Sequence, residues 1–506
     1  MRKYGPLVLG LLFLSVPVAV ADQPQGKVVA DTWEMLQLGG YRVGHVHTVT
    51  REAAVKDAKV LRTNMQFELT LKRAGAVQKL KLDNGSDETA DGKVLGISMR
   101  MEQVVQEGTV EEKGLHLKVN GGQIDKYVPW NDDVIGLYRQ EQVFKDKKVK
   151  AGDKFTFSGY EPSITAVVTV RGKAGEAEEV ATLKGKKKLL RVELASDPIA
   201  VPKPGSDETF KLQLPKMIVW LDKDWVPVRR QTDMPGLGTI VFQRTDRETA
   251  TAAVETVPDI LANVNIPLNR AIANPTATRG VVFRVTLKDD DDPTTALAQD
   301  ARQEIKNAKG NSFELHVKAI RSPQKVEKPD APVKEEYLKS CFFLKCDDPR
   351  VKALTESAVG EETEPLKKAR RIERWVFENV RNDNQVPFVP ADHVARLLKG
   401  DCRQHAMLAA AMCRAADVPS RTAVGLVYAT DERGKPMMAY HMWTEVWVQG
   451  QWLAIDPELG QGSIAATHVK IADHSWYDTH SVTPLLSVAR VLDKLSIEVI
   501  SVNGAR

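Results

Sequence analysis

The sequence predicts an α+β protein in which an N-terminal antiparallel all-β region precedes a C-terminal α+β domain. The chain has 506 residues, which is too long for one hydrophobic core, because single cores stop growing at roughly 250–300 residues. Apolar and polar residues alternate with period two through the first half, whereas helical spacing of apolar residues begins only near residue 360. The predicted segments are a signal peptide at 1–21, a β-rich domain at 22–260, a small β-containing segment with a linker at 261–335, and a C-terminal domain at 336–506.

The first residues are typical of a secretory signal peptide. Arg2 and Lys3 form a basic start, an apolar run follows at 7–16, and the small residues Ala19-Val20-Ala21 give a cleavage motif. The run is short for a bilayer span, which takes about 20 apolar residues. We therefore expect an exported protein, periplasmic or extracellular, with no membrane span after signal removal. An uncleaved membrane anchor is the alternative.

The charge and composition of the chain argue against a nucleic-acid partner. The formal net charge is only +4, and the 42% hydrophobic and 27% charged residues are ordinary globular usage. A nucleic-acid-binding protein would need a larger and clustered excess of Lys and Arg. We expect no nucleic-acid partner.

The four cysteines are too few for a disulfide scaffold. Cys341 and Cys346 are close enough in sequence to be bridged after export, but in one straight strand they would point to opposite faces. Whether they are bridged stays open. Cys413 lies in an Ala-rich helical run and is expected to be a small core residue.

Period-two runs separated by turn residues predict the antiparallel strands of the first half. Asn84-Gly85, Asn120-Gly121 and Gly185 are expected to mark hairpin ends, and no long helical pattern interrupts the region. The strands with the clearest alternation are 65–71, 115–119, 166–170 and 189–194, followed by a hairpin at 217–222 and 225–230 and by two further strands at 281–287 and 313–317.

Two groups outside the C-terminal domain have residue types that bind metals. His45 and His47 share a strand face, and Asp289–Asp292 form an acidic run. The histidines lack a third ligand nearby, and the acidic run lacks the Gly and the distant Glu of an EF-hand loop. We interpret both as surface features and expect no metal and no cofactor. The Pro-rich stretch 322–332 is expected to be a linker.

Two helices are predicted in the C-terminal domain. The first starts near Thr363 and carries one apolar face from Leu366 to Val380. The second follows Gly400-Asp401 and ends at Asp417, before Pro419. This places Cys402 at a helix N-terminus, where free N–H groups and the helix dipole favour a thiolate and can also bind an oxyanion.

A hairpin count places a histidine beside a carboxylate. Strands are predicted at 422–429, 438–448 and 452–456, with Gln449-Gly450 as a two-residue turn. This register sets Trp443 opposite Asp456, so that His441 lies on the same face, diagonal to Asp456. A loop one residue longer or shorter would separate the pair.

Cys402, His441 and Asp456 therefore have the residue types of a nucleophile triad. Cys402 would attack a carbonyl, His441 would move the proton, and Asp456 would orient His441. His405 and His393 are poor candidates for the base. Asn384 and Gln385 are guesses for a side-chain oxyanion donor.

The surrounding motifs resemble the bacterial transglutaminase-like superfamily, whose core is similar to papain. The resemblance covers roughly 337–460, about a quarter of the chain, and departs at Asp417, where the family often has Gly. The matching motifs are GDCRQHA at 400–406, RAADVPSR at 414–421, HMW at 441–443 and WLAIDP at 452–457.

The resemblance implies a transglutaminase-like, papain-like α+β catalytic domain at 336–506 that transfers an amide or peptide acyl group through a thioester. Water as acceptor gives a peptidase or amidase, which we favour, and an amine gives a crosslinking enzyme. A protein or peptide, such as a cell-envelope component, is the expected substrate. The alternative is a non-catalytic envelope binding or structural protein that retains the module.

Overall fold

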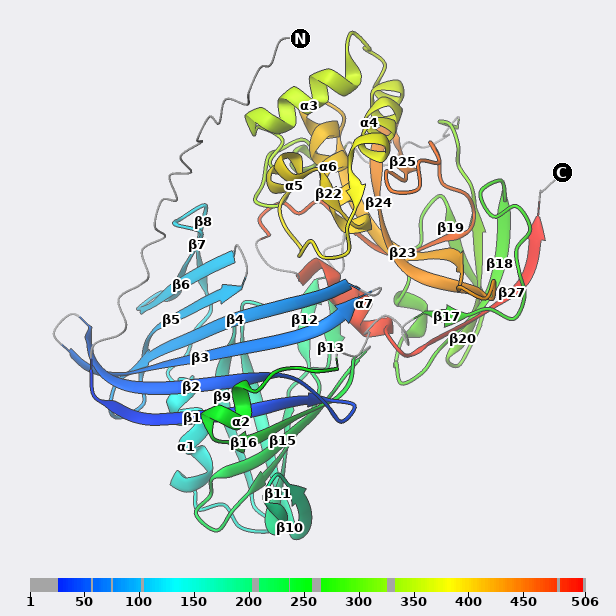
Figure 1. The fold of residues 1–506 in the computed structure, drawn as a ribbon. Helices are drawn as coiled ribbons and strands as arrows, with labels where there is room; N and C mark the ends of the chain where they lie inside the picture. Colours follow the sequence, from blue (N-terminus) through cyan, green and yellow to red (C-terminus); the bar gives the residue numbers. More distant parts are fainter. Residues whose placement is uncertain are drawn as a thin grey trace, which may run out of the picture.

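The computed structural model describes residues 26–503 apart from short gaps at 56–57, 74–75, 102–103, 203–208, 236, 257–264, 325–332 and 480–482. The predicted signal peptide and most of the predicted linker lie outside the described residues. Within the described part of the chain, no helix is long and apolar enough to cross a membrane. In Figure 1 the long strands of the first half lie below a group of helices from the C-terminal part.

The first half forms one antiparallel sheet of 14 strands, in the order β8-β7-β6-β5-β4-β3-β2-β1-β16-β15-β14-β11-β10-β9. This confirms the predicted antiparallel region. In chain order the strands are β1 (Val28–Leu38), β2 (Tyr41–Val55), β3 (Ala58–Arg73), β4 (Ala76–Glu88), β5 (Val94–Met101), β6 (Val104–Glu111), β7 (Gly114–Val119), β8 (Ile124–Val128), β9 (Lys154–Glu161), β10 (Ala166–Thr182), β11 (Gly185–Ser196), β14 (Met217–Leu221), β15 (Pro227–Met234) and β16 (Gly238–Thr245). A separate hairpin joins β12 (Ile199–Pro202) and β13 (Thr209–Leu212).

Two of the three predicted hairpin ends are confirmed. Asn120-Gly121 follows β7 and Gly185 opens β11, each with positive φ. The prediction at Asn84-Gly85 was wrong, because β4 continues through both residues. Gly85 is instead needed for close approach of neighbouring strands, since a Cβ there would lie 2.4 Å from the Ser98 hydroxyl.

Helix α1 (Leu137–Asp146) interrupts the β region, where no helix was predicted. Its first N–H groups are satisfied by side chains from a distant strand. Glu88 accepts hydrogen bonds from the main-chain N–H groups of Tyr138 and Arg139, and Ser86 accepts one from Leu137. The cap lies about 50 residues upstream, so no local motif marks the start of this helix.

In the C-terminal part, four helices pack with a five-stranded sheet. Helix α6 is central, and its residues from Ala406 to Cys413 are fully buried, which confirms Cys413 as a core residue. The helices are α3 (Pro349–Val359), α4 (Pro365–Asn379), α5 (Ala391–Leu397) and α6 (Cys402–Ala415). The sheet contains β17 (Ile266–Pro267), β23 (Ser420–Thr430), β24 (Pro436–Val448), β25 (Gln451–Ile455) and β26 (His468–His474).

A four-stranded sheet joins the middle segment to the end of the chain. It has the order β19-β20-β18-β27, formed by β18 (Gly280–Leu287), β19 (Gln303–Lys309), β20 (Ser312–Lys318) and β27 (Leu495–Asn503). Strands from both sides of the predicted domain boundary at residue 335 therefore pair in one sheet. The boundary itself stays a prediction. The remaining short elements are α2 (Arg247–Thr251), β21 (Arg381–Asn382), β22 (Lys399–Gly400) and α7 (Leu486–Val491).

The two groups of metal-binding residue types have structural partners. His47 stacks on Trp33 and lies 3.0 Å from Asp31. In the acidic run, Asp290 receives two 2.8 Å hydrogen bonds from Arg490, close to helix α7. These contacts favour the interpretation of both groups as structural surface features.

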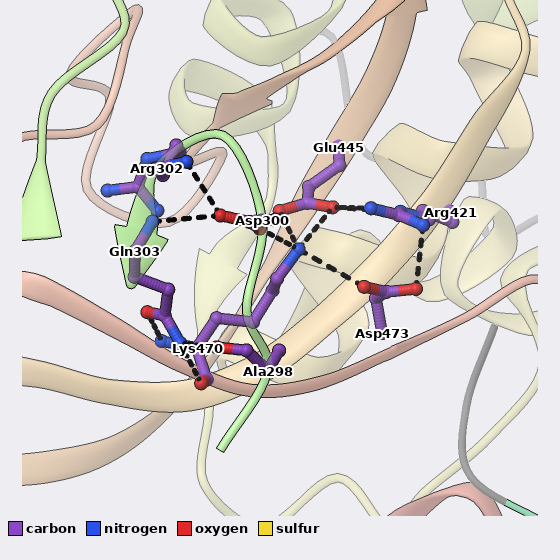
Figure 2. A network of polar contacts seen from close by, with 8 residues as sticks. All are labelled: Ala298, Asp300, Arg302, Gln303, Arg421, Glu445, Lys470 and Asp473. Carbon is purple, nitrogen blue, oxygen red and sulfur yellow. Dashed lines mark hydrogen bonds and ion pairs between the residues drawn. The ribbon is translucent and has the colours of Figure 1, made fainter. Parts of the chain in front are cut away.

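A buried charge network fastens the segment around Asp300 to the C-terminal sheet, as Figure 2 shows. Lys470 is 1% exposed and its ammonium group lies 3.1 Å from both Glu445 and Asp473, and it also pairs with Asp300. Arg421 contacts Glu445 and Asp473, each at 2.7 Å. The network links strands β23, β24 and β26 on the same sheet that carries His441.

Candidate active site

The start of helix α6 presents Cys402 at its first position. Asp401 is the N-cap and accepts a 2.9 Å hydrogen bond from the N–H of Arg403, while the Gln404 side chain accepts one from the N–H of Asp401. This capping box fixes the first turn. The N–H of Cys402 has no acceptor within the helix at this position, and the Cys402 side chain is only half-buried. The predicted helix start is confirmed.

The hairpin register also agrees with the prediction. Trp447 pairs with Trp452 and Thr444 with Ile455, around a turn in which Gln449 and Gly450 have φ of 52° and 80°. Both positive values suit the tight turns that match strand twist. One residue beyond the last pair, Asp456 reaches the face of the sheet that carries His441.

His441 connects the thiol to the carboxylate. Its Nε2 lies 2.8 Å from Oδ2 of Asp456, which leaves Nδ1 for Cys402. The side chains of Cys402, His441 and Glu458 each place one sulfur, nitrogen or oxygen atom in a group whose members all lie within 4.8 Å of one another. Burial alone lowers the pKa of His441, but the Asp456 carboxylate and the Cys402 sulfur outweigh it and hold that pKa well above its usual range. The structure thus brings the three predicted residues together.

Asp456 is fully buried, and all of its recorded partners donate to it. Oδ2 accepts from Nε2 of both His441 and His468, the second at 3.0 Å, and Oδ1 accepts from the main-chain N–H groups of Glu458 and Leu459. Burial raises the pKa of Asp456, but the two imidazoles hold it well below its usual range. Asp456 therefore keeps its negative charge next to His441.

His468 was missed by sequence reasoning. It lies at the start of β26, is fully buried, and has a pKa lowered by burial. A neutral ring that carries its proton on Nε2 fits this position, because that N–H can donate to Asp456. No local motif relates β26 to the β24–β25 hairpin, so the sequence offered no signal for this contact.

Glu458 was also missed. Its side chain is 20% exposed, and Oε2 lies 3.4 Å from Nδ1 of His441. Burial raises the pKa of Glu458. The carboxyl group therefore shares the Nδ1 side of His441 with the Cys402 sulfur. The sequence signal that could have identified Glu458 was its position two residues after Asp456, with Pro457 between them.

The remaining candidates have other positions. Both ring nitrogens of His405 face main-chain oxygens, of Asp401 at 2.8 Å and of Val380 at 3.1 Å, so His405 anchors the helix start. His393 lies on α5. Asn384 is half-buried and Gln385 exposed, and their role as oxyanion donor stays a prediction.

Two groups of side chains in the site have the sulfur, nitrogen and oxygen atoms that bind Zn²⁺ in proteins. They are Cys402–His441–Glu458 and His441–Asp456–His468. Each atom of the second group is already engaged in a hydrogen bond of the triad. An ion bound to the first group would block the sulfur. These hydrogen bonds favour acid–base chemistry over metal binding at these residues.

Glu373 on α4 supports the loop that follows Asp456. It is 2% exposed, and its Oε1 accepts a 2.7 Å hydrogen bond from the N–H of Gly462. Burial, with a smaller contribution from the Asp456 charge, raises the pKa of Glu373 from 4.5 to about 7.

This pKa predicts a pH-dependent effect of Glu373→Gln. The unfolded chain releases the proton near pH 4.5 and the folded protein near pH 7, so the ionised carboxylate destabilises the fold as pH rises between these values. The difference in unfolding free energy between the variant and wild type should therefore change in favour of the variant by up to about 3 kcal/mol from pH 5 to pH 8. Urea unfolding at both pH values measures this, and an equal difference at both would contradict it.

Comparison with known proteins agrees with this geometry. Residues 352–457 match the family model of the transglutaminase-like superfamily. This segment is similar to a transglutaminase-like core. An uncharacterized protein of Haemophilus influenzae is 35% identical over 107 residues, which make up 20% of this chain and 29% of that relative.

Three solved structures have low overall similarity to this chain. A cysteine protease candidate from Cytophaga hutchinsonii has 14% identity and a TM-score of 0.29, covering 46% of this chain and 82% of its own. The periplasmic domain of TgpA from Pseudomonas aeruginosa has 16% identity and a TM-score of 0.22, covering 39% and 94%. A beta-barrel-like protein from Brucella abortus has 12% identity and a TM-score of 0.31, covering 43% and 95%.

Proposed function

We propose that this protein is an exported thiol enzyme that transfers an amide or peptide acyl group through a thioester on Cys402. One observation carries the proposal: His441 lies between a half-exposed cysteine at a helix start and a fully buried carboxylate, with its Nε2 2.8 Å from Asp456. The proposed export rests on the signal-like residues 1–21.

In the first half-reaction, the Cys402 sulfur attacks the substrate carbonyl carbon and its proton passes to Nδ1 of His441. The N–H of Cys402, free at the first helix position, can donate to the oxyanion. His441 then gives the proton to the leaving nitrogen as the C–N bond breaks. An amine departs and a thioester remains on Cys402. Asp456 keeps the proton on Nε2 and stabilises the imidazolium.

In the second half-reaction, an acceptor attacks the thioester and gives its proton to His441, after which the Cys402 sulfur leaves. Water as acceptor completes hydrolysis, and a primary amine completes transamidation. We favour hydrolysis, because an exported enzyme meets water at far higher concentration than any amine.

A non-catalytic envelope protein that keeps the module is the second candidate. The fourteen-stranded sheet, whose strands lie between residues 28 and 245, would then hold the partner and the thiol would be idle. The half-exposed position of Cys402 beside His441 favours the enzyme, since an idle cysteine needs neither access nor a base.

Incubation with cell-envelope extract tests the proposal. Wild type is compared with Cys402→Ser and with the control Cys341→Ser, whose thiol lies outside the triad, and the products are analysed by mass spectrometry. New amino termini or released ammonia that require Cys402 would support hydrolysis, and new isopeptide bonds would support transamidation. Identical product profiles for wild type and Cys402→Ser would overturn the enzyme proposal.

A further inference from the structure

The large N-terminal sheet encloses a cavity. The segment before helix α1 bridges two parts of the sheet, because Ile135 pairs with Lys93 beside β5 and its N–H donates to Ser158 of β9 at 2.9 Å. Strands from both halves of the sheet and helix α1 line a cavity of about 430 Å³. That volume lies in the range of small-molecule sites, whereas a core that serves only stability is filled by side chains.

The wall of this cavity is mainly apolar. Strand pairing places Val46, Phe67 and Leu82 side by side on β2, β3 and β4. Phe157 and Phe242 belong to the same lining. Of these five residues only Val46 is fully buried; the others keep exposed surface although they face the interior of the sheet. Such a wall provides a binding surface for an apolar group.

The charged residues that line the cavity disfavour anionic ligands. Arg230 donates to Glu34 at 3.0 Å and to Glu141 at 2.9 Å. Two carboxylates thus face one guanidinium, and Glu161 adds a third carboxylate to the lining. The cavity therefore has an excess of negative charge and disfavours an anionic ligand.

Two buried polar atoms of the lining, Oδ1 of Asn84 and the Tyr160 hydroxyl, lack a hydrogen-bond partner among the described residues. The side-chain oxygen of Asn84 is buried, and no hydrogen bond reaches it from the described residues. Asn84 pairs with Met65 on β3, so this acceptor lies within the apolar wall. Leaving a buried acceptor unsatisfied costs free energy. A ligand with a hydroxyl or amide donor would recover that energy.

We propose that this cavity binds one uncharged amphiphile, with its apolar chain against the Phe and Val wall and a hydroxyl or amide group donating to Asn84. The site is separate from Cys402 and does not depend on the proposed enzyme chemistry. It assigns the N-terminal half the task of holding a lipid-like molecule.

Calorimetric titration of the mature protein with monodecanoylglycerol tests the proposal, with decanoate as the anionic probe of equal chain length. We expect saturable 1:1 binding of the neutral probe and at least about ten-fold weaker binding of decanoate. Asn84→Leu is expected to weaken binding of the neutral probe about ten-fold without lowering the melting temperature. Leu82→Trp, which narrows the cavity, should weaken it similarly.

Two controls separate this site from other effects. Asn64→Leu changes the neighbouring strand position paired with Gly85, on the other face of the sheet, and should bind as wild type does. Cys402→Ser should also bind unchanged, so failure of the enzyme proposal leaves this test intact. Absence of binding to wild type, equal or tighter binding of decanoate, or binding by Asn84→Leu and Leu82→Trp as tight as that of wild type would overturn the proposal.

Discussion

Asp456→Asn is expected to slow alkylation of Cys402 by roughly 10²–10⁴-fold, the range that positioned proton transfer contributes. The reason lies in the hydrogen bonds of the carboxylate. Oδ1 accepts from the N–H groups of Glu458 and Leu459, so the amide oxygen of Asn must occupy that side. The amide NH₂ then faces Nε2 of His441, so this nitrogen must accept a hydrogen bond and cannot carry the proton. The proton moves to Nδ1, and His441 can no longer take the proton of Cys402.

Peptide mass spectrometry after iodoacetamide treatment at pH 7 measures the rate. His468→Gln should give a smaller loss, about ten-fold, because it removes one of two imidazoles that hold Asp456. Asp224→Asn, in an exposed turn before β15, is the control and should react as wild type does. A wild-type rate in Asp456→Asn would show that the carboxylate does not set the tautomer of His441.

Lys470→Met is expected to destabilise the protein by about 3–5 kcal/mol, the cost of removing one partner from a buried ion pair. The substitution keeps most of the unbranched apolar side chain but leaves three carboxylates, Asp300, Glu445 and Asp473, without their shared ammonium group. Arg421 still reaches Glu445 and Asp473 and balances only part of their charge.

Urea unfolding followed by tryptophan fluorescence measures this loss. Lys186→Met is the matched control, because Lys186 and Glu179 form a pair 75% and 64% exposed, and such pairs contribute at most about 1 kcal/mol. Equal stability of Lys470→Met and wild type would show that the network in Figure 2 does not hold the sheet and the Asp300 segment together.

The parts of the site that the sequence predicted are those with local signals. Asp401 and Gln404 cap the helix within four residues, which places Cys402 at its start. A two-residue turn fixes the register of the next hairpin, so counting from Gln449-Gly450 places His441 beside Asp456.

The parts that it did not predict depend on contacts between distant segments. His468 reaches Asp456 only because β26 pairs with β23 on the side opposite to β24. Helix α1 is capped by Glu88 from another strand. Asn84-Gly85 has the composition of a turn, but both residues pair with strands β3 and β5 and so lie within a strand. In each case tertiary contacts outweigh the local pattern.

The most direct test of the central claim is site-resolved alkylation of the four cysteines at pH 7, in wild type and in His441→Ala. We expect Cys402 of wild type to react much faster than Cys341, Cys346 and Cys413, because it is half-exposed beside His441. We expect His441→Ala to abolish this selectivity while the protein stays folded. A Cys402 that reacts no faster than Cys341, or equally fast without His441, would show that these residues do not form an active triad.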